Sequence, residues 1–95
     1  MKITFYSNPY LSQMNHRKNV RSAIAGKTKF GDNLSASAWE SSLDGKIRWS
    51  VTANIQRDGL CDFETLAFGV ADSMEAAEHL SALASKPFVA IPAEA

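Results

Sequence analysis

Residues 46–56 alternate strictly between polar and apolar side chains. One side of this stretch carries Ile47, Trp49, Val51, Ala53 and Ile55. Successive side chains of a strand point to opposite faces of its sheet, so this alternation predicts a half-buried β-strand. The pattern restricts the chain to folds in which one face of a sheet packs on a core and the other face is exposed to solvent.

Turn signals flank this strand on both sides. Asp44-Gly45 lies before it, and Asp-Gly is typical of a type I′ hairpin turn, which needs positive φ. We therefore expect a preceding strand over residues 35–43. Arg57-Asp58-Gly59 reverses the chain again, and residues 60–70 then predict a third strand.

The apolar pattern of the third strand shifts by one residue. Cys61 and Phe63 share one parity, whereas Leu66, Phe68 and Val70 have the other. A β-bulge near residues 64–65 would turn both groups inward. The expected core therefore comprises Trp49, Val51, Ile55, Phe63 and Phe68.

A helix is expected after the third strand. Asp72-Ser73 begins it, and Asp72 with Glu75 forms a variant of the capping box. The predicted apolar stripe is Ala76, Ala77, Leu80, Leu83 and Ala84. Pro87 ends the helix. Residues 88–91 then form an edge strand or pack across the helix.

The first third of the chain has a weaker pattern. Residues 2–6 alternate and predict a short strand with Ile3 and Phe5 inward. Residues 11–25 have a helix-compatible composition but poor periodicity. They fit either an irregular segment followed by a short helix or one helix packed on two sides. We expect a helix near residues 15–25, with Gly26 as its cap.

A chain of 95 residues is expected to form a single domain, residues 1–95. The predicted class is α+β. An antiparallel sheet of three to four strands carries a C-terminal helix on one face, beside a shorter basic N-terminal helix. The single Cys61 favours a reducing compartment. With no leader pattern and no apolar run of about 18 residues, we expect no membrane partner and a cytoplasmic protein.

Charge is sorted along the chain. Residues 1–31 hold six basic residues and no acidic one, and residues 32–95 hold four basic and ten acidic residues. The two segments therefore carry 6 − 0 = +6 and 4 − 10 = −6. A folded domain of this kind has either a strong attraction between its halves or separate basic and acidic surfaces.

No pattern for catalysis, metal or cofactor binding is complete. Gly26-Lys27-Thr28 lacks the second glycine of a phosphate-binding loop, because Arg21 stands at that position. His16, His79 and one cysteine do not supply a zinc site. Cys61 is expected to be a small core residue. We therefore expect neither an enzyme nor a bound cofactor or metal.

Two basic features are the candidate binding sites. On a helix, Arg17 and Arg21 would lie four residues apart and form a ridge that binds phosphates or an acidic protein. The polar side of residues 46–56 carries Lys46 and Arg48 among hydrogen-bonding residues and no acid. The candidate partner-binding residues are Arg17, Lys18, Arg21, Lys27, Lys29, Lys46 and Arg48.

Four known groups of proteins share parts of this pattern. With Arg48-Trp49, residues 51–55, 66–69 and 72–77, the stretch 45–84 resembles the three-stranded sheet plus helix of plant AP2-type and phage integrase arm-binding domains. That resemblance implies DNA contact by the sheet. The element order is also similar to double-stranded-RNA-binding domains, although residues 72–75 lack the basic helix start of that family. In size and charge pattern, the chain is similar to phage-encoded anti-CRISPR inhibitors.

These observations lead to two functional hypotheses. The first is a non-catalytic protein-interaction module that inhibits a nucleic-acid-handling, CRISPR-like complex through a charged surface. Its expected partner is a protein or a nucleoprotein complex, in the cytoplasm of a host cell if the chain is phage-encoded. The second is a nucleic-acid-binding domain that uses the sheet face and the basic N-terminal helix. An open sheet edge or residues 88–91 could also support a homodimer.

Overall fold

A computed structural model describes residues 3–9 and 16–93. In chain order its elements are β1 (Tyr6–Ser7), β2 (Arg17–Lys27), β3 (Asn33–Ser41), β4 (Ile47–Arg57), β5 (Leu60–Ala71), α1 (Met74–Ser85), the short 3-10 helix η2 (Lys86–Phe88) and β6 (Ile91–Pro92). The strands form one antiparallel sheet in the order β1-β2-β3-β4-β5, and β6 also pairs with β2. The α+β class and the antiparallel sheet are confirmed, with more strands than expected.

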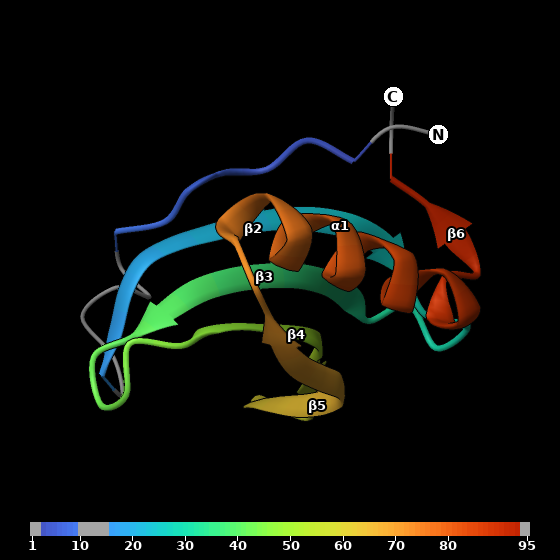
Figure 1. Cartoon of the computed structure of the whole chain (residues 1–95). Helices are drawn as coiled ribbons and strands as arrows, with labels where there is room; N and C mark the ends of the chain where they lie inside the picture. Colours follow the sequence, from blue (N-terminus) through green and yellow to red (C-terminus); the bar gives the residue numbers. More distant parts are fainter. Residues whose placement is uncertain (1–2, 10–15, 94–95) are drawn as a thin grey trace.

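Helix α1 covers one face of the sheet, mainly over β3 and β4 (Figure 1). The buried layer between them is built largely from small side chains, which let the helix approach the sheet closely. Among the described residues, the largest fully buried apolar side chains are those of Leu34, Val20 and Val51. The buried alanines are Ala23, Ala25, Ala36, Ala38, Ala53 and Ala77.

The predicted C-terminal helix is confirmed, but it begins one residue later than expected. The Ser73 hydroxyl accepts a hydrogen bond from the Ala76 backbone N–H at 3.0 Å and is the N-cap. Asp72 is therefore not the cap. The α-helix ends at Ser85, where η2 begins with Pro87 in its first turn.

The expected apolar stripe of α1 is only partly the face that meets the sheet. Ala77, Ser81 and Ser85 are its buried residues. The Ser81 and Ser85 hydroxyls donate to carbonyls of the helix itself, so both can be buried against an apolar sheet. Leu80 and Leu83 remain exposed on the flank of the helix.

Both predicted hairpins form, with different turns. Asp58 and Gly59 have φ of 53° and 77° and connect the paired residues Arg57 and Leu60, which is the geometry expected of a type I′ turn. At the first hairpin, only Gly45 has positive φ, at 72°. A longer loop over residues 42–46 therefore replaces the type I′ turn expected there.

The predicted N-terminal helix is wrong: within residues 15–25, His16 lies in a turn and strand β2 begins at Arg17. The register of β2 against β3 shifts twice, between Lys18 and Arg21 and between Ile24 and Gly26. Asn19, at the first shift, has φ of 52°. Each extra residue reverses the inside–outside parity, so the alternation that identifies a strand is lost from the sequence. Residue 15 lies outside the described residues.

The terminal segments lie along the outer edge of β2 (Figure 1). The expected strand over residues 2–6 is shorter and later, at Tyr6–Ser7, while Ile3 packs against the core as predicted. Residue 2 is outside the described residues. The edge strand expected within residues 88–91 forms at Ile91–Pro92.

The β-bulge predicted in β5 is present, but it turns Phe63 and Phe68 outward. Val51 pairs with Ala67 and Thr52 with Thr65, so Leu66 is the extra residue. Phe63 is 66 % exposed and Phe68 78 % exposed, so their predicted places in the core are wrong. Val51 is buried as predicted, and Trp49 and Ile55 pack against the core while partly exposed.

The side chain of Trp49 explains which face of β5 points inward. A Cβ on Gly69 would lie only 2.9 Å from three atoms of the indole ring. The ring therefore occupies the space over Gly69, between Ala67 and Ala71 along the same face of β5. Small residues are needed on that face, and the bulky residues of β5 go to the other.

Candidate functional site

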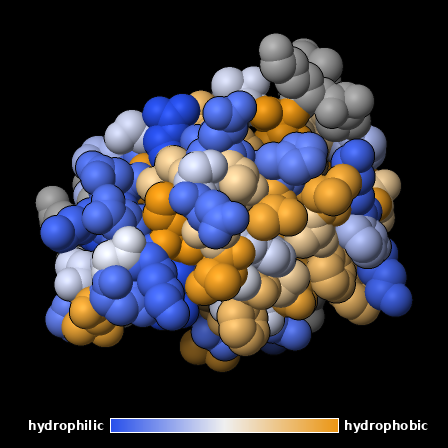
Figure 2. Space-filling model, in the orientation of Figure 1, coloured by the Kyte–Doolittle hydropathy of each residue, from blue (hydrophilic) through white to orange (hydrophobic). Residues whose placement is uncertain are grey.

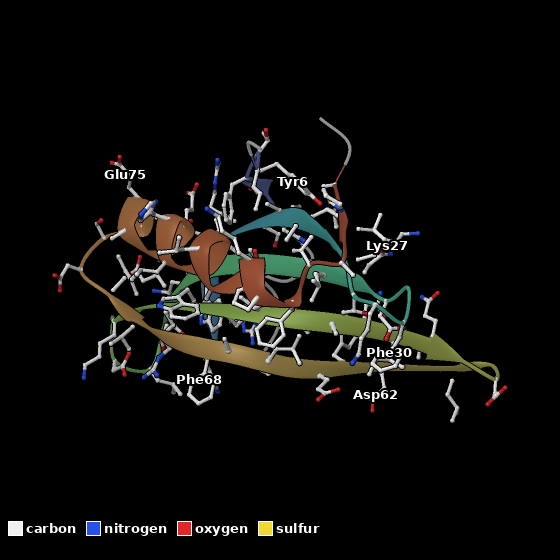
Figure 3. The ribbon with its side chains drawn as sticks, turned by 90° about the vertical axis from the view of Figure 1, so that its right-hand side faces the viewer. Tyr6, Lys27, Phe30, Asp62, Phe68 and Glu75 are labelled. Atoms are coloured by element: carbon white, nitrogen blue, oxygen red, sulfur yellow. The ribbon has the colours of Figure 1, made fainter. Side chains whose placement is uncertain are left out.

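The face of the sheet opposite α1 is the candidate site, because no described helix lies on it. The strand register places side chains of four strands there: Arg17, Ser22, Ile24 and Lys27 from β2; Asn33, Ser35, Ser37, Trp39 and Ser41 from β3; Arg48, Ser50, Thr52, Asn54 and Gln56 from β4; Cys61, Phe63, Thr65, Phe68 and Val70 from β5. We call this set the open face. Phe68 points away from α1 (Figure 3).

A row of serines crosses the open face. Ser22 pairs with Ser37, and Ser37 with Ser50, on adjacent strands. All three are buried, and the hydroxyl oxygens of Ser22 and Ser37 lie 3.2 Å apart in a hydrogen bond. The small residues form the floor of the face, below larger side chains on either side. The row ends at Phe68, which pairs with Ser50.

A stacked cation lies at one end of this floor. The Arg17 guanidinium carbon lies 3.9 Å from the centroid of the Trp39 ring, within cation–π range. Arg48 pairs directly with Trp39 from the neighbouring strand. Partial burial lowers the pKa of Arg17 from its ordinary value, because desolvation disfavours the charged form. Guanidinium groups nevertheless remain protonated in proteins, so Arg17 is a cation.

Two exposed phenylalanines lie at the other side of the face. Phe63 pairs with Asn54 and Phe68 with Ser50, so their Cα atoms are four β4 residues apart, about 13 Å along the strand. Arg17, Trp39, Arg48, Ser50 and Phe68 are among the residues that line a hollow between the two groups. Flat apolar rings and a stacked guanidinium thus surround a hydroxyl floor.

The register places the acidic residues of β5 on the other face of the sheet. Asp62 pairs with Ile55 and Glu64 with Ala53, on the side that α1 covers. Within the described residues, the register assigns no aspartate or glutamate to the open face. The acids nearest in sequence to its aromatics therefore do not compete with a negatively charged ligand there.

The seven candidate binding residues are not brought together as one ridge. Arg17, Lys27 and Arg48 belong to the open face. Lys18 pairs with Glu40 on the other face, and Arg21 approaches Glu78 of α1, with Nε and Oε2 3.5 Å apart. The helical Arg17–Arg21 ridge is therefore wrong, because β2 is a strand and places the two residues on opposite faces.

The two remaining lysines lie in loops. Lys29 follows β2, and its ammonium lies 5.2 Å from the centroid of the Phe30 ring. Lys46 is exposed in the loop between β3 and β4, and its backbone N–H donates to Asp44 Oδ1 at 3.0 Å. Neither side chain is part of the open face.

Asp44 reaches from that loop to the end of the open face. Arg48 donates to Asp44 Oδ2 at 2.6 Å. The hydrogen bond from the Lys46 N–H and then the bond from Arg48 lower the pKa of the Asp44 carboxyl from its ordinary 3.8. Asp44 thus holds the Arg48 guanidinium at the rim of the open face, the end nearest the β3–β4 loop. Because the Asp44 carboxylate is exposed, a phosphate group can displace it from Arg48.

Sequence reasoning missed the aromatic part of the site. Trp39 was not singled out, and Phe63 and Phe68 were assigned to the core. The sequence does contain an indication of the inward face of β5, because the small residues Ala67 and Gly69 alternate with Phe68. Cys61 was also expected inside, and it is exposed.

Comparison of the chain with protein-family models, curated proteins and solved structures finds no match. In the described part of the chain, no three histidines, cysteines or acids are grouped as a metal site. The one long helix described, α1, falls short of the length and apolarity needed to cross a membrane. The open face is therefore the feature of the described chain that bears on function.

Proposed function

We propose that this chain is a non-catalytic binding module that holds single-stranded nucleic acid over its open face. One observation carries the proposal: exposed aromatic rings, cations and hydrogen-bonding side chains share a sheet face whose strands contribute no acid, with Asp44 bound to Arg48 at its rim. Proteins that bind single strands combine a positively charged surface with aromatic platforms on which bases stack. The open face supplies both features.

The cations account for contact with the phosphate backbone. Arg17 and Arg48 lie beside the tryptophan end of the face, and Lys27 lies at the far end of β2. Each phosphate that a cation neutralises releases counterions, so binding weakens as salt rises. Three contacts predict a slope of log K against log salt of about −2 for a single strand.

The aromatic residues account for contact with the bases. Phe63 and Phe68 expose their rings, and the Arg17 guanidinium presents a flat cation over Trp39. At a spacing of about 13 Å along the strand, the two phenylalanines can stack bases that are not adjacent. A sheet of this kind typically stacks roughly two or three bases.

The polar residues between these platforms can read base edges. Thr52, Asn54 and Gln56 line β4 between the hydroxyl floor and its far end. Their side chains both donate and accept hydrogen bonds. In a duplex the base faces are already stacked and cannot meet phenylalanine rings, so the arrangement favours an unpaired strand.

The test is a titration of fluorescently labelled ten-nucleotide DNA and RNA strands, followed by anisotropy at 50 and 150 mM salt. Loss of one base–aromatic stack costs about 1–3 kcal/mol, so Phe68→Ala is expected to weaken binding roughly five- to hundredfold. Arg17→Gln is expected to weaken binding and flatten the salt slope by about 0.7.

Two controls match these variants outside the open face. Phe88→Ala removes another partly exposed aromatic ring, and Lys86→Gln removes another cation, both in η2. Neither change is expected to alter the affinity. Absence of binding by the parent chain, or equal losses in test and control variants, would refute the proposal.

The protein-interaction and inhibitor hypothesis is the second candidate, and charge sorting supports it. Among the described ion pairs, Arg21–Glu78 is the one that joins the basic first segment to the acidic remainder. Exposed Asp58, Asp62 and Glu64 lie together along β5 and its turn. If strands do not bind, capture of a nucleic-acid-handling complex that Glu64→Lys abolishes and Arg17→Glu leaves intact would assign the contact to this acidic edge.

A further inference from the structure

The two long edges of the sheet differ. The outer edge of β2 is covered by β1 and β6. At the other edge, β5 runs for 12 residues, Leu60–Ala71, and no described strand lies beyond it. Lysine, arginine and proline, which commonly blunt such edges, are absent from β5. Its outward N–H and C=O groups are available to another strand.

Apolar side chains flank the free edge on both faces. On the open face, Phe68 and Phe63 are exposed. On the other face, Leu80 is 37 % and Leu83 49 % exposed on the flank of α1, and Leu80 lines a hollow with Val70. Figure 2 shows apolar surface extending below α1 toward β5. An unpaired strand with apolar surface on both sides is an association site.

We propose that two copies of this chain pair through their β5 strands, antiparallel, around a twofold axis between Thr65 and Leu66. Residues whose numbers sum to 131 then lie opposite one another. The resulting pairs are Leu60 with Ala71, Cys61 with Val70, Asp62 with Gly69, Phe63 with Phe68 and Glu64 with Ala67, each formed twice.

The bulge makes this register self-consistent. Because Leu66 is an extra residue, the parity of β5 reverses at its centre. Phe63 and the partner's Phe68 therefore lie on the same face, although their numbers differ in parity. Thr65 and the extra residue Leu66 lie at the twofold axis, so five regular residue pairs form on each side of it.

The charge pattern favours a second copy as the occupant. Both acids of β5, Asp62 and Glu64, lie in its first half, and its second half is uncharged. Antiparallel self-pairing places each acid opposite the partner's glycine or alanine, so no like charges face each other. It also forms two cross-strand phenylalanine pairs, an arrangement that stabilises antiparallel sheets.

This dimer does not depend on the proposed nucleic-acid binding, but it would extend that surface. The two open faces would join into one sheet across the axis. Both α1 helices would lie on the opposite side, with Leu80 and Leu83 turned toward the axis.

Sedimentation velocity of the full chain between about 5 and 200 μM tests the association. We expect the 10.4 kDa chain to shift toward twice that mass with rising concentration. Thr65 is exposed next to the axis, so Thr65→Lys and Thr65→Glu each bring two like charges together and are expected to weaken dimerisation at least tenfold. Gln56→Lys adds a charge to an exposed residue of the interior strand β4 and is expected to leave the dimer intact.

A monomeric parent chain at 200 μM, or a dimer that tolerates both Thr65 variants, would overturn the proposal. The same variants separate it from the nucleic-acid hypothesis. Thr65→Lys adds a cation and Thr65→Glu an anion to the open face, so the two variants are expected to change strand affinity in opposite directions while both weaken the dimer.

Cross-linking tests the register. Cys61 lies opposite the partner's Val70, at a separation that a disulfide can bridge. Val70→Cys is therefore expected to form a covalent dimer on mild oxidation. Within one chain, the two thiols would be about 30 Å apart along β5 and cannot pair. Ala71→Cys, on the other face, is the control, and equal cross-linking by both variants would refute the register.

Discussion

Truncating one apolar residue on each face of the sheet, and comparing the losses of unfolding free energy, tests which face is the core. Leu34 is fully buried under α1, whereas Phe68 is 78 % exposed on the open face. Leu34→Ala removes a core side chain and leaves a cavity, a change that costs about 2–5 kcal/mol of unfolding free energy. Phe68→Ala loses only the transfer free energy of the buried fifth of a larger side chain, roughly 0.5 kcal/mol.

Urea denaturation followed by far-ultraviolet circular dichroism measures both values. With a denaturant slope of about 1.5 kcal/mol per molar, a loss of about 3 kcal/mol moves the midpoint by roughly 2 M. The corresponding shift for Phe68→Ala is about 0.3 M. Both proteins must be measured at low micromolar concentration, where the proposed dimer dissociates.

Equal midpoint shifts would refute this account of β5. They would mean that Phe68 lies in the core and that the bulge turns the phenylalanines inward, as the sequence predicted. The open face would then lose its aromatic platforms. Leu60→Ala, which truncates a residue 74 % exposed beside the β4–β5 turn, is the control for truncation of another exposed apolar residue of β5.

Three further predictions concern single sites. Ser73→Ala is expected to cost about 1 kcal/mol of unfolding free energy because it removes the N-cap acceptor, and Asp72→Ala is expected to cost less than half of that. Gly69→Ala is expected to destabilise the fold by about 1–3 kcal/mol, because the added methyl group meets the tryptophan ring of β4, and both tests use the same denaturation assay. A carbon-detected NMR titration is expected to give Asp44 a pKa below 3.8 that rises in Arg48→Ala; the stability it contributes is present above its unfolded pKa and is lost as pH falls through the folded one.

The second half of the fold could be predicted because its local patterns agree with its packing. The alternation of residues 46–56, the Asp58-Gly59 turn and the start of α1 each specify one structure, and each is found within a residue or two. The turn at Asp44-Gly45 shows the limit. The same dipeptide supports a tight turn in one hairpin and a longer loop in the other, since the pairing of the flanking strands sets the loop length.

Strand β2 could not be predicted from its pattern because two bulges erase the alternation. Val20 and Ile24 then match a helical spacing by coincidence. Pairing with β3 on one side and with β1 and β6 on the other stabilises the strand, and a single segment does not reveal those contacts. Tertiary pairing thus overrides local preference.

The sequence predicted the polar residues of the candidate site but not its aromatic residues. Arg48 and the polar residues of β4 were assigned to the correct face, because alternation alone decides it. Phe63 and Phe68 were misplaced because a large apolar residue is usually buried. The Trp49 ring occupies the space over Gly69, so this side of β5 has no room for the phenylalanines.

Chemical-shift mapping of the ¹⁵N-labelled chain with an unlabelled eight-nucleotide strand locates the surface that binds the strand. We expect the perturbed amides to gather on β3, β4 and β5, with changes in the Phe63 and Phe68 ring protons, and the outer surface of α1 to stay unchanged. Perturbations confined to α1 and η2, or a spectrum unchanged at saturating strand, would contradict binding at the open face.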